Sequence, residues 1–232
     1  MRAAQDASLA EQVHVRLRAD IVHARLRPGA LLSENQQALR LGVSRTPVRE
    51  SIRRLVQEGW VHVLPQRGTR VSLLSLARIR EALFVREAVE THGLRRLLAA
   101  APDAQGWKQL DACIALQSQA LKAQQLEATL AADAQFHRTL LDLCGMGAVW
   151  PVVAQARDMH QRVRAIALPE LQSGRQALSD HRAIVRALRK GDAQAAVAAL
   201  ALHLHHNEVL VQKIAQLHPE YFEGPADVDR II

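Results

Sequence analysis

Two short helical segments separated by a single glycine constrain the fold of this chain more than any other feature. The first begins near Ser33, a residue type that caps helices, and ends at Gly42. The second runs over residues 44–58 and stops at Gly59, and its proline, Pro47, falls in the first turn, where a missing N–H costs little. Short helices joined in this way are typical of a helix-turn-helix motif.

The segments around this motif predict a winged version of it. An earlier helix begins at the capping box Ser8-Leu-Ala-Glu11. After the second helix of the motif, residues 60–64 and 69–72 are rich in strand-forming side chains and flank the turn sequence Pro65-Gln66-Arg67-Gly68, which predicts a β-hairpin. We therefore expect residues 1–76 to form a winged helix-turn-helix domain with a small β-hairpin.

Positive charge is concentrated in the same part of the chain. Residues 1–76 hold 12 arginines and 6 acidic residues, a net +6, whereas residues 77–232 hold 18 basic and 17 acidic residues, a net +1. A small basic module beside a nearly neutral one suggests DNA recognition, although a solvated basic surface would give the same count. Arg45, Arg49 and Arg53 recur every four positions, so they share one helix face that suits the phosphates and guanine edges of a major groove.

Composition excludes several other classes of protein. With 49% apolar and 23% charged residues, the chain is typical of a globular protein and not of a disordered one. Its longest apolar run, residues 195–202, is shorter than the roughly 20 residues that a membrane helix needs, and its first residues lack the apolar core of a signal peptide. We therefore expect a cytoplasmic protein with no membrane partner. Two cysteines, Cys113 and Cys144, exclude a disulfide scaffold.

The helix-turn-helix region resembles a known family. Residues 41–55, Leu-Gly-Val-Ser-Arg-Thr-Pro-Val-Arg-Glu-Ser-Ile-Arg-Arg-Leu, with Glu-Gly-Trp-Val at 58–61, are similar to the GntR family of bacterial transcription regulators, and the wing-like residues 66–71 support the match. Many relatives carry arginine after the acidic residue that starts the motif, where this chain has Asn35 after Glu34, so one phosphate contact is expected to be weaker. From this resemblance and the arginine spacing, we expect DNA contacts from Ser44, Arg45, Thr46, Arg49, Arg53, Arg67 and Gly68.

The rest of the chain is helical in pattern almost to its end. We expect about six helices over residues 77–232, with breaks near Pro102, Gly145 to Gly147, Pro169 to Gly174, and Gly191. The tail after His218 is expected to be frayed or loosely docked. These residues should therefore form an all-helical bundle, which makes the whole chain mainly α.

Three segments of the bundle resemble the ligand-sensing FCD domain of the FadR-type branch of the GntR family. They are Asp133-Ala-Gln-Phe-His137, Ser179-Asp-His181 and the last-helix pattern that runs from Gly191 to His203. The resemblance implies an all-helical sensor domain.

The polar residues of these segments interrupt apolar helix faces. Asp133 and His137 lie one turn apart on a stripe with 3,4 spacing, and His181 and His203 fall on the apolar faces of two later helices. Imidazoles and a carboxylate that converge inside a bundle can bind one divalent transition metal per chain, such as Zn²⁺, Ni²⁺ or Mn²⁺. The alternative is that each histidine is a hydrogen-bonded core residue.

A charged residue also interrupts the apolar stripe of the first helix of the bundle. Arg86 lies four residues before Glu90, in a segment, residues 84–90, that resembles the opening signature of the FCD domain. Either the two form an ordinary i, i+4 ion pair, or the guanidinium is held for the carboxylate of an anionic effector. His160 and Arg164, one turn apart on another helix, are further candidates for an effector pocket.

Together these features predict a DNA-binding transcriptional regulator and not an enzyme. We expect a homodimer on double-stranded operator DNA. The resemblance implies repression of a metabolic operon that is relieved by a small organic or sugar acid bound near the metal. Two alternatives remain: a metal-dependent hydrolase, because an open Asp and His site can activate water, and an architectural DNA-binding protein whose second domain only dimerises.

Overall fold

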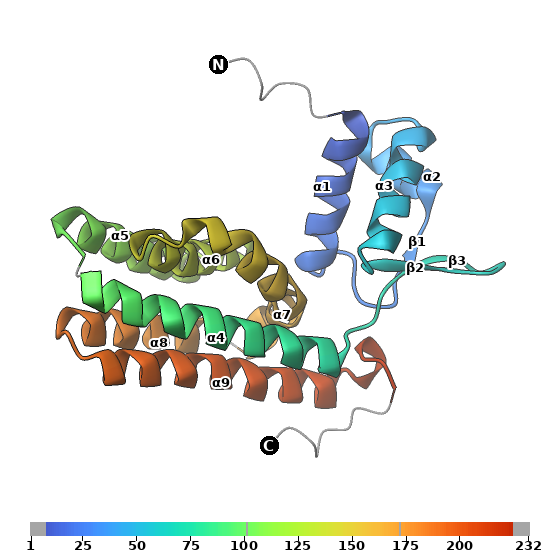
Figure 1. The fold of residues 1–232 in the computed structure, drawn as a ribbon. Coiled ribbons are helices and arrows are strands. Elements are labelled where there is room, and N and C mark those ends of the chain that lie inside the picture. The colour runs from blue at the N-terminus through green and yellow to red at the C-terminus, as the bar shows by residue number, and fades with distance from the viewer. Residues whose placement is uncertain (1–7, 101, 172, 225–232) are drawn as a thin grey trace. The chain divides into compact units, whose positions relative to one another are not determined.

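The computed structural model describes residues 8–100, 102–171 and 173–224 of the 232-residue chain. These residues form two compact units (Figure 1). The first, which we call the N-terminal unit, contains residues 8–75 together with residues 218–224 of the described ranges. The second, the helical unit, contains residues 76–217.

The N-terminal unit is a winged helix-turn-helix. Its elements are α1 (Leu9–Val22), β1 (Leu31–Leu32), α2 (Glu34–Leu41), α3 (Arg45–Gln57), β2 (Val61–Leu64) and β3 (Gly68–Val71). The strands form an antiparallel sheet in the order β1-β3-β2, with Val61 opposite Val71 and Leu31 opposite Arg70. Strand β1 was not expected, because two residues are too few to show the period-2 alternation that marks a strand.

The ends of the helices follow the capping signals in the sequence. The Ser8 hydroxyl accepts a hydrogen bond from the Glu11 N–H at 3.2 Å and starts α1. Ser33 caps α2 in the same way, and Gly42 ends it with a φ of +66°, a left-handed conformation that suits glycine. Ser44 precedes α3 with an extended backbone and makes no side-chain capping bond.

The segment after the last long helix belongs to the N-terminal unit. The Leu74 N–H donates to the Tyr221 carbonyl at 2.8 Å, and the Glu223 N–H donates to the Leu74 carbonyl at 2.9 Å. Phe222 is buried, and Arg27 donates to the Tyr221 hydroxyl at 2.6 Å. The expectation of a loosely docked tail is therefore wrong for residues 218–223, because two aromatic side chains anchor this segment.

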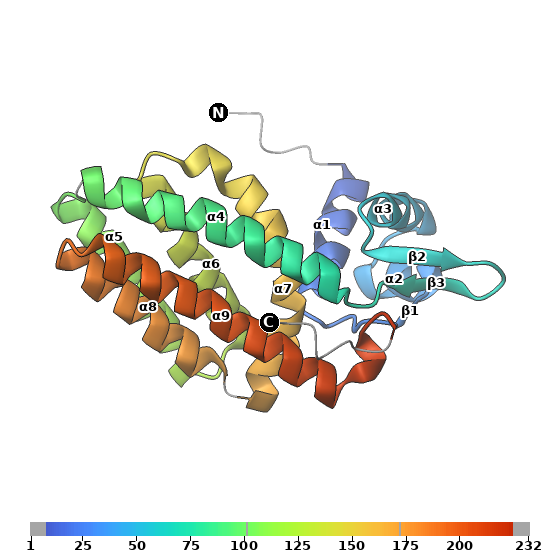
Figure 2. The ribbon, with the colours of Figure 1, turned by 60° about the horizontal axis from the view of Figure 1, so that its bottom comes forward.

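The helical unit contains six α-helices in the described ranges. They are α4 (Leu76–Ala100), α5 (Ala104–Lys122), α6 (Leu126–Leu143), α7 (Trp150–Leu171), α8 (Ser173–Arg189) and α9 (Ala193–Leu217). Helices α4 and α9 run side by side, and α8 packs beside α9 (Figure 2). The apolar core lies between the helices and includes Leu97, Leu110, Phe136, Ile184 and Leu200.

Two helix boundaries differ from the expected breaks. Helix α5 ends before Gln124, whose positive φ of +53° interrupts the helix without a glycine or proline to announce it. Helix α7 continues through Pro169, which lies in its last turn, and ends at Leu171.

The predicted fold class, a mainly helical chain with a winged helix-turn-helix and a helical bundle, is confirmed. Among the helices of the described ranges, none is long and apolar enough to cross a membrane.

Candidate functional site

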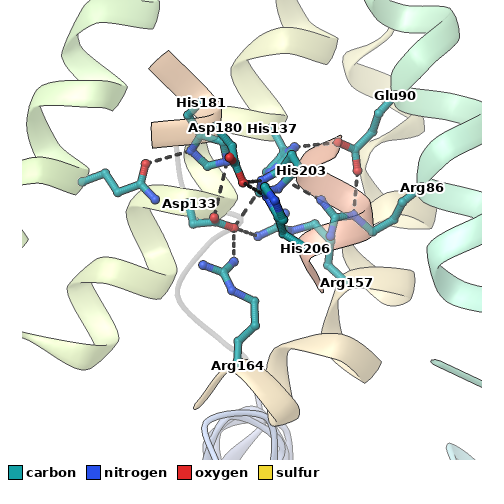
Figure 3. Close-up of polar contacts among 11 residues, drawn as sticks. Arg86, Glu90, Asp133, His137, Arg157, Arg164, Asp180, His181, His203 and His206 are labelled. Atoms are coloured by element: carbon teal, nitrogen blue, oxygen red, sulfur yellow. Dashed lines mark hydrogen bonds and ion pairs between the residues drawn. The ribbon is translucent and has the colours of Figure 1, made fainter. Parts of the chain in front are cut away.

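Four polar side chains meet in the interior of the helical unit (Figure 3). Helix α6 contributes Asp133 and His137, one turn apart, α8 contributes His181, and α9 contributes His203. Each is at most 1% exposed, and each offers a ligand atom that lies within 4.8 Å of the others. The structure thus brings together the four residues that the helical periodicity placed on apolar faces, and we call them the His/Asp cluster.

Hydrogen bonds fix which nitrogen of the histidine rings carries the proton. His137 Nδ1 lies 2.6 Å from a carboxylate oxygen of Glu90, and His181 Nδ1 lies 2.8 Å from the amide oxygen of Gln117. Both partners accept only, so each Nδ1 carries its hydrogen and donates it. The lone pair of each neutral ring is therefore on Nε2, the nitrogen that faces the cluster.

The third histidine has a similar partner. His203 Nδ1 lies 3.4 Å from Asp180 Oδ2, and the same oxygen is 2.9 Å from His206 Nδ1. A carboxylate behind a histidine orients the ring and increases its basicity toward a metal, an arrangement that is common in metal sites. All three rings of the cluster thus direct Nε2 toward a shared centre.

Three of the four atoms that face this centre lack a hydrogen-bond partner, whereas the fourth, His137 Nε2, lies 3.3 Å from Arg86 Nη2 and accepts from it. Asp133 Oδ1, His181 Nε2 and His203 Nε2 are buried and accept no hydrogen bond from the residues that the structure describes. A buried acceptor without a partner is costly, and such atoms call for an explanation. A divalent cation would satisfy all three at once, so the residues fit a metal site.

Burial keeps the histidine rings neutral. It lowers the pKa of His137 from its usual value to about 3, and it also lowers the pKa of His181 and of His203. Neutral imidazole is the form that coordinates a metal, because a protonated ring has no free lone pair.

Arginines surround the carboxylate of the cluster. Arg157 and Arg164, both on α7, form ion pairs with the same oxygen of Asp133, its Oδ2. Although burial alone would raise it, the pKa of Asp133 is held well below its usual range by Arg164 and Arg157. Oδ1, the other oxygen, faces His181 at 3.6 Å. The carboxylate is thus ionised and shared between the arginines and the cluster.

Arg86 forms the ion pair with Glu90 that its spacing predicted, but in a buried setting. Arg86 Nε lies 2.8 Å from Glu90 Oε1, and both side chains are at most 3% exposed. Arg86 Nη2 is also 3.3 Å from His137 Nε2. Burial lowers the pKa of His160, and the charges of nearby Arg86 and Arg164 lower it further. The three expected effector residues therefore lie near one another beside the cluster.

A cavity of about 410 Å³ lies next to the cluster. It shares His203, Arg164 and Asp180 with the network just described. Its lining also includes Arg175, His206, Asn207 and Lys213. The lining holds three cations, Arg164, Arg175 and Lys213, against one carboxylate, Asp180. This excess of positive charge next to a set of metal-binding donors suits a small anion.

Several residues of this network were not predicted. Gln117, Arg157 and Asp180 contact the cluster from helix faces that local periodicity did not single out, and Glu90 was expected only as the partner of Arg86. A usable signal existed for Arg157, because Arg157, His160 and Arg164 follow a 3,4 spacing on α7.

The predicted DNA-contacting residues lie on exposed positions of the N-terminal unit. Those on and before α3 are Ser44, Arg45, Thr46, Arg49 and Arg53. In the wing, Arg67 lies on the turn between β2 and β3, and Gly68 is the first residue of β3. Two of the arginines are paired with Glu34 of α2: Arg49 Nη2 lies 3.0 Å and Arg45 Nη2 3.3 Å from the same oxygen. Hydrogen bonding to Arg49 lowers the pKa of Glu34. This role of Glu34 was not predicted.

Comparison with known proteins agrees with this architecture. Residues 9–71 match the model of the bacterial regulatory proteins of the gntR family, and residues 81–206 match that of the FCD domain. An uncharacterised transcriptional regulator from an unstable DNA locus of Streptomyces ambofaciens is 38% identical over 92% of this chain and 89% of its own. The Escherichia coli transcriptional repressor RspR is 31% identical over 91% of this chain and 92% of its own.

A solved structure has the same fold. The Escherichia coli protein McbR/YncC superposes with a TM-score of 0.74 at 22% identity, covering 90% of this chain and 99% of its own. The two family models and the names of the Streptomyces and RspR relatives are those of transcription regulators, which decides against the hydrolase alternative. The chain belongs to the GntR family of bacterial transcription regulators, in the FadR-like branch with a C-terminal FCD domain.

Proposed function

We propose that this protein is a repressor of a metabolic operon whose hold on its operator is controlled by a small carboxylate effector, bound beside a divalent transition metal in the helical unit. The observation that carries the proposal is the His/Asp cluster, in which three Nε2 lone pairs and one carboxylate oxygen face a shared centre. The name of the relative RspR as a repressor supports the sign of the regulation.

The N-terminal unit supplies the DNA-binding function. With α3 in the major groove, Arg45, Thr46 and Arg49 reach base edges and phosphates, and Arg67 and Gly68 of the wing reach a neighbouring groove. A homodimer would place two such units on a pseudo-palindromic operator.

The helical unit supplies the sensing function. Asp133, His137, His181 and His203 would hold Zn²⁺, Ni²⁺ or Mn²⁺, and such an ion attracts carboxylate oxygens as a Lewis acid. Arg164 lines the cavity, and we expect it to bind the rest of an anionic effector by a charge-assisted hydrogen bond. Arg86 and His160 do not line this cavity but lie near Arg164, and they stay further candidates for the effector site. An effector that binds one conformation of this unit more tightly than another shifts the balance between forms that bind the operator and forms that do not.

Metal analysis of matched histidine variants tests the cluster. We expect about one transition-metal ion per chain in gently purified protein, measured by inductively coupled plasma mass spectrometry. His203→Ala should lose the ion, because a cluster ligand is removed, whereas His205→Ala, on an exposed position of the same helix, should retain it. A wild-type protein that takes up no Zn²⁺, Ni²⁺ or Mn²⁺ would leave the histidines as core residues.

Operator binding tests the role of α3. Arg49→Ala should weaken binding to the promoter of an adjacent operon about tenfold or more, since a contact to a specific base pair is lost. Arg138→Ala, which removes one exposed charge from the helical unit, is the matched control and should bind as the wild type does. Equal affinities of the two variants would contradict the assignment of α3.

Release from the operator by a metabolite tests the sensing function and separates it from the architectural alternative. Arg86→Lys retains a cation for Glu90 but loses the planar fork of donors. We expect this variant to bind the operator normally without effector and to need a higher effector concentration for release. A protein that no carboxylate releases from DNA would favour the architectural alternative.

A further inference from the structure

In the described ranges the chain passes between the two units at two places, and both connections are short. It leaves the N-terminal unit after Ser75 and begins α4 at Leu76, and it returns after Leu217, the last residue of α9. Only His218 separates the end of α9 from the 3-10 helix Pro219–Tyr221, which belongs to the N-terminal unit. Connections of this length contain no slack, so a shift at either helix end reaches the neighbouring residues directly.

Both connections meet at one point inside the N-terminal unit. Leu74, two residues before α4, pairs with Phe222 in a parallel bridge, and both side chains are buried. The backbone N–H of Leu74 donates to the Tyr221 carbonyl, and its carbonyl accepts from the Glu223 N–H. We call residues 218–223 the docked segment. It fastens the residues that follow α9 to the residues that precede α4.

The candidate site is built on the same two helices. Helix α4 contributes Glu90, whose carboxylate is bonded to His137 of the cluster. The cavity beside the cluster is lined along α9 by His203, His206, Asn207, Val209, Leu210 and Lys213. Lys213 lies four residues before Leu217, a rise of about 6 Å along the helix. A ligand in this cavity would therefore contact α9 to within about one turn of the docked segment.

A metal in the His/Asp cluster would restrict the movement of α9. His203 would share the ion with His181 of α8 and with Asp133 and His137 of α6, so the ion would join three helices. A restricted α9 holds the attached segment close to Leu74, which raises the effective concentration of the segment at its docking position. Ordering that the metal has already imposed also lowers the entropy cost of docking.

We infer that the docked segment is the element through which the candidate site acts on the N-terminal unit. Occupation of the site holds residues 218–223 against Leu74, and an empty site lets them detach more often. The inference rests on the proposed sensing function, because the cluster must bind a metal. It goes beyond that function by naming the residues that carry the signal to the DNA-binding unit.

Amide hydrogen exchange of the full-length protein, followed by NMR with and without Zn²⁺, tests the inference. The amides of Leu74 and Glu223 report on docking, because each donates one of the hydrogen bonds that fasten the segment. The amide of Trp60, which donates to the Leu55 carbonyl, is the reference in the same unit. We expect Zn²⁺ to slow exchange at Leu74 and Glu223 about fivefold or more, as a typical coupling between sites does, and to change Trp60 less.

An insertion separates the docked segment from α9 without changing either. Two glycines between Leu217 and His218 give slack to a short, stiff connection. This variant should still bind Zn²⁺ in calorimetry, but the ion should no longer slow exchange of the docked-segment amides. The same insertion between Gly191 and Asp192, in the turn that joins α8 and α9, is the matched control and should keep the wild-type response.

The outcomes separate the inference from the proposed function. If Zn²⁺ binds the wild type but does not slow Leu74 and Glu223, or slows Trp60 equally, the inference is overturned and the sensing function remains. A wild-type response in the Leu217 insertion variant would also overturn it. If Zn²⁺ does not bind, the sensing function fails, and the inference fails with it. Circular dichroism verifies the fold of each variant, and if the insertion variant does not fold, the wild-type measurements decide.

Discussion

The two units of this protein contain the same ionic arrangement in opposite surroundings. In the N-terminal unit, the carboxylate of Glu34 holds Arg45 and Arg49, with about half of each arginine side chain exposed. In the helical unit, the carboxylate of Asp133 holds Arg157 and Arg164, with no side chain more than 5% exposed. The chemistry is alike, so the surroundings decide what each arrangement does.

Because the ion pairs of Glu34 with Arg45 and Arg49 are exposed, these arginines can change partners easily. Ion pairs between exposed side chains stabilise a protein by about 0–1 kcal/mol, because water and salt screen them. Arg45 and Arg49 can therefore leave Glu34 for phosphates or bases at little cost. Burial has the opposite effect, since a charge that loses its partner in the interior is not rescued by water. The buried arrangement can respond only to another charge that enters the interior, such as a metal or an anion.

The largest effect is expected from removing the buried carboxylate. Asp133→Ala leaves Arg157 and Arg164 without their shared partner, and breaking a buried pair in this way costs about 3–5 kcal/mol of unfolding free energy. Urea denaturation of the full-length protein in the presence of a chelator measures this loss of unfolding free energy. Glu34→Ala is the matched variant of the exposed arrangement and should unfold at nearly the wild-type urea concentration. If Asp133→Ala and Glu34→Ala lose similar amounts of unfolding free energy, burial does not distinguish the ionic arrangements of the two units.

Acid should destabilise the metal-free protein through the buried histidines. The folded-state pKa of His137 is about 3 because burial lowers it, so between pH 6.5 and about 3 the unfolded chain binds a proton that the folded chain does not. Stability is therefore lost as the pH falls through this window, by about 1.4 kcal/mol per pH unit for each such ring.

The lowered pKa of His160 acts in the same direction as that of His137. Below the usual pKa of a carboxyl group, Asp133 takes up a proton in the unfolded chain but stays ionised in the folded chain, because its folded-state pKa is held well below that value. This difference adds to the loss of stability. Urea denaturation at a series of pH values in chelator follows these changes. A stability that is constant from pH 7 to pH 5 would mean that the rings are not buried in neutral form.

The smallest effect is expected from changing the exposed carboxylate. Glu34→Gln frees Arg45 and Arg49 from their partner, so affinity for a scrambled duplex should rise about twofold and its salt dependence should steepen. Affinity for the operator should rise less, so discrimination falls. Fluorescence anisotropy at several salt concentrations measures both.

Glu11→Gln is the control for this measurement. It removes the same charge from α1, where Glu11 pairs with Arg54 and not with the predicted DNA-contacting arginines. If this variant raises non-specific affinity as much as Glu34→Gln does, net charge accounts for the effect, and Glu34 has no special role in holding the two arginines.

Local signals explain why much of this structure was predictable. Ser8, Ser33 and Gly42 mark helix ends through hydrogen bonds to residues a few positions away, so sequence alone contains the information. The same is true of Asp133 and His137, whose spacing of one turn puts both on the buried face of α6.

The remainder depends on contacts between distant segments. Gln117 meets His181 across 64 residues, and no local pattern indicates which polar residue of α5 faces α8. Strand β1 exists because two residues pair with β3, and its length is below what a periodic pattern can reveal. Partners of this kind follow from how helices and strands pack, which local sequence does not specify.

The pairing of Leu74 with Tyr221 and Phe222 has a consequence for the order in which the protein is made. A ribosome releases α1, α2, α3 and the wing early, but the segment that covers Leu74 leaves it only after the whole helical unit has been synthesised. The DNA-binding unit is thus begun first and completed last. A nascent chain carries its arginines well before the backbone of Leu74 finds its partners, and a chain cut short after α9 would never complete this unit.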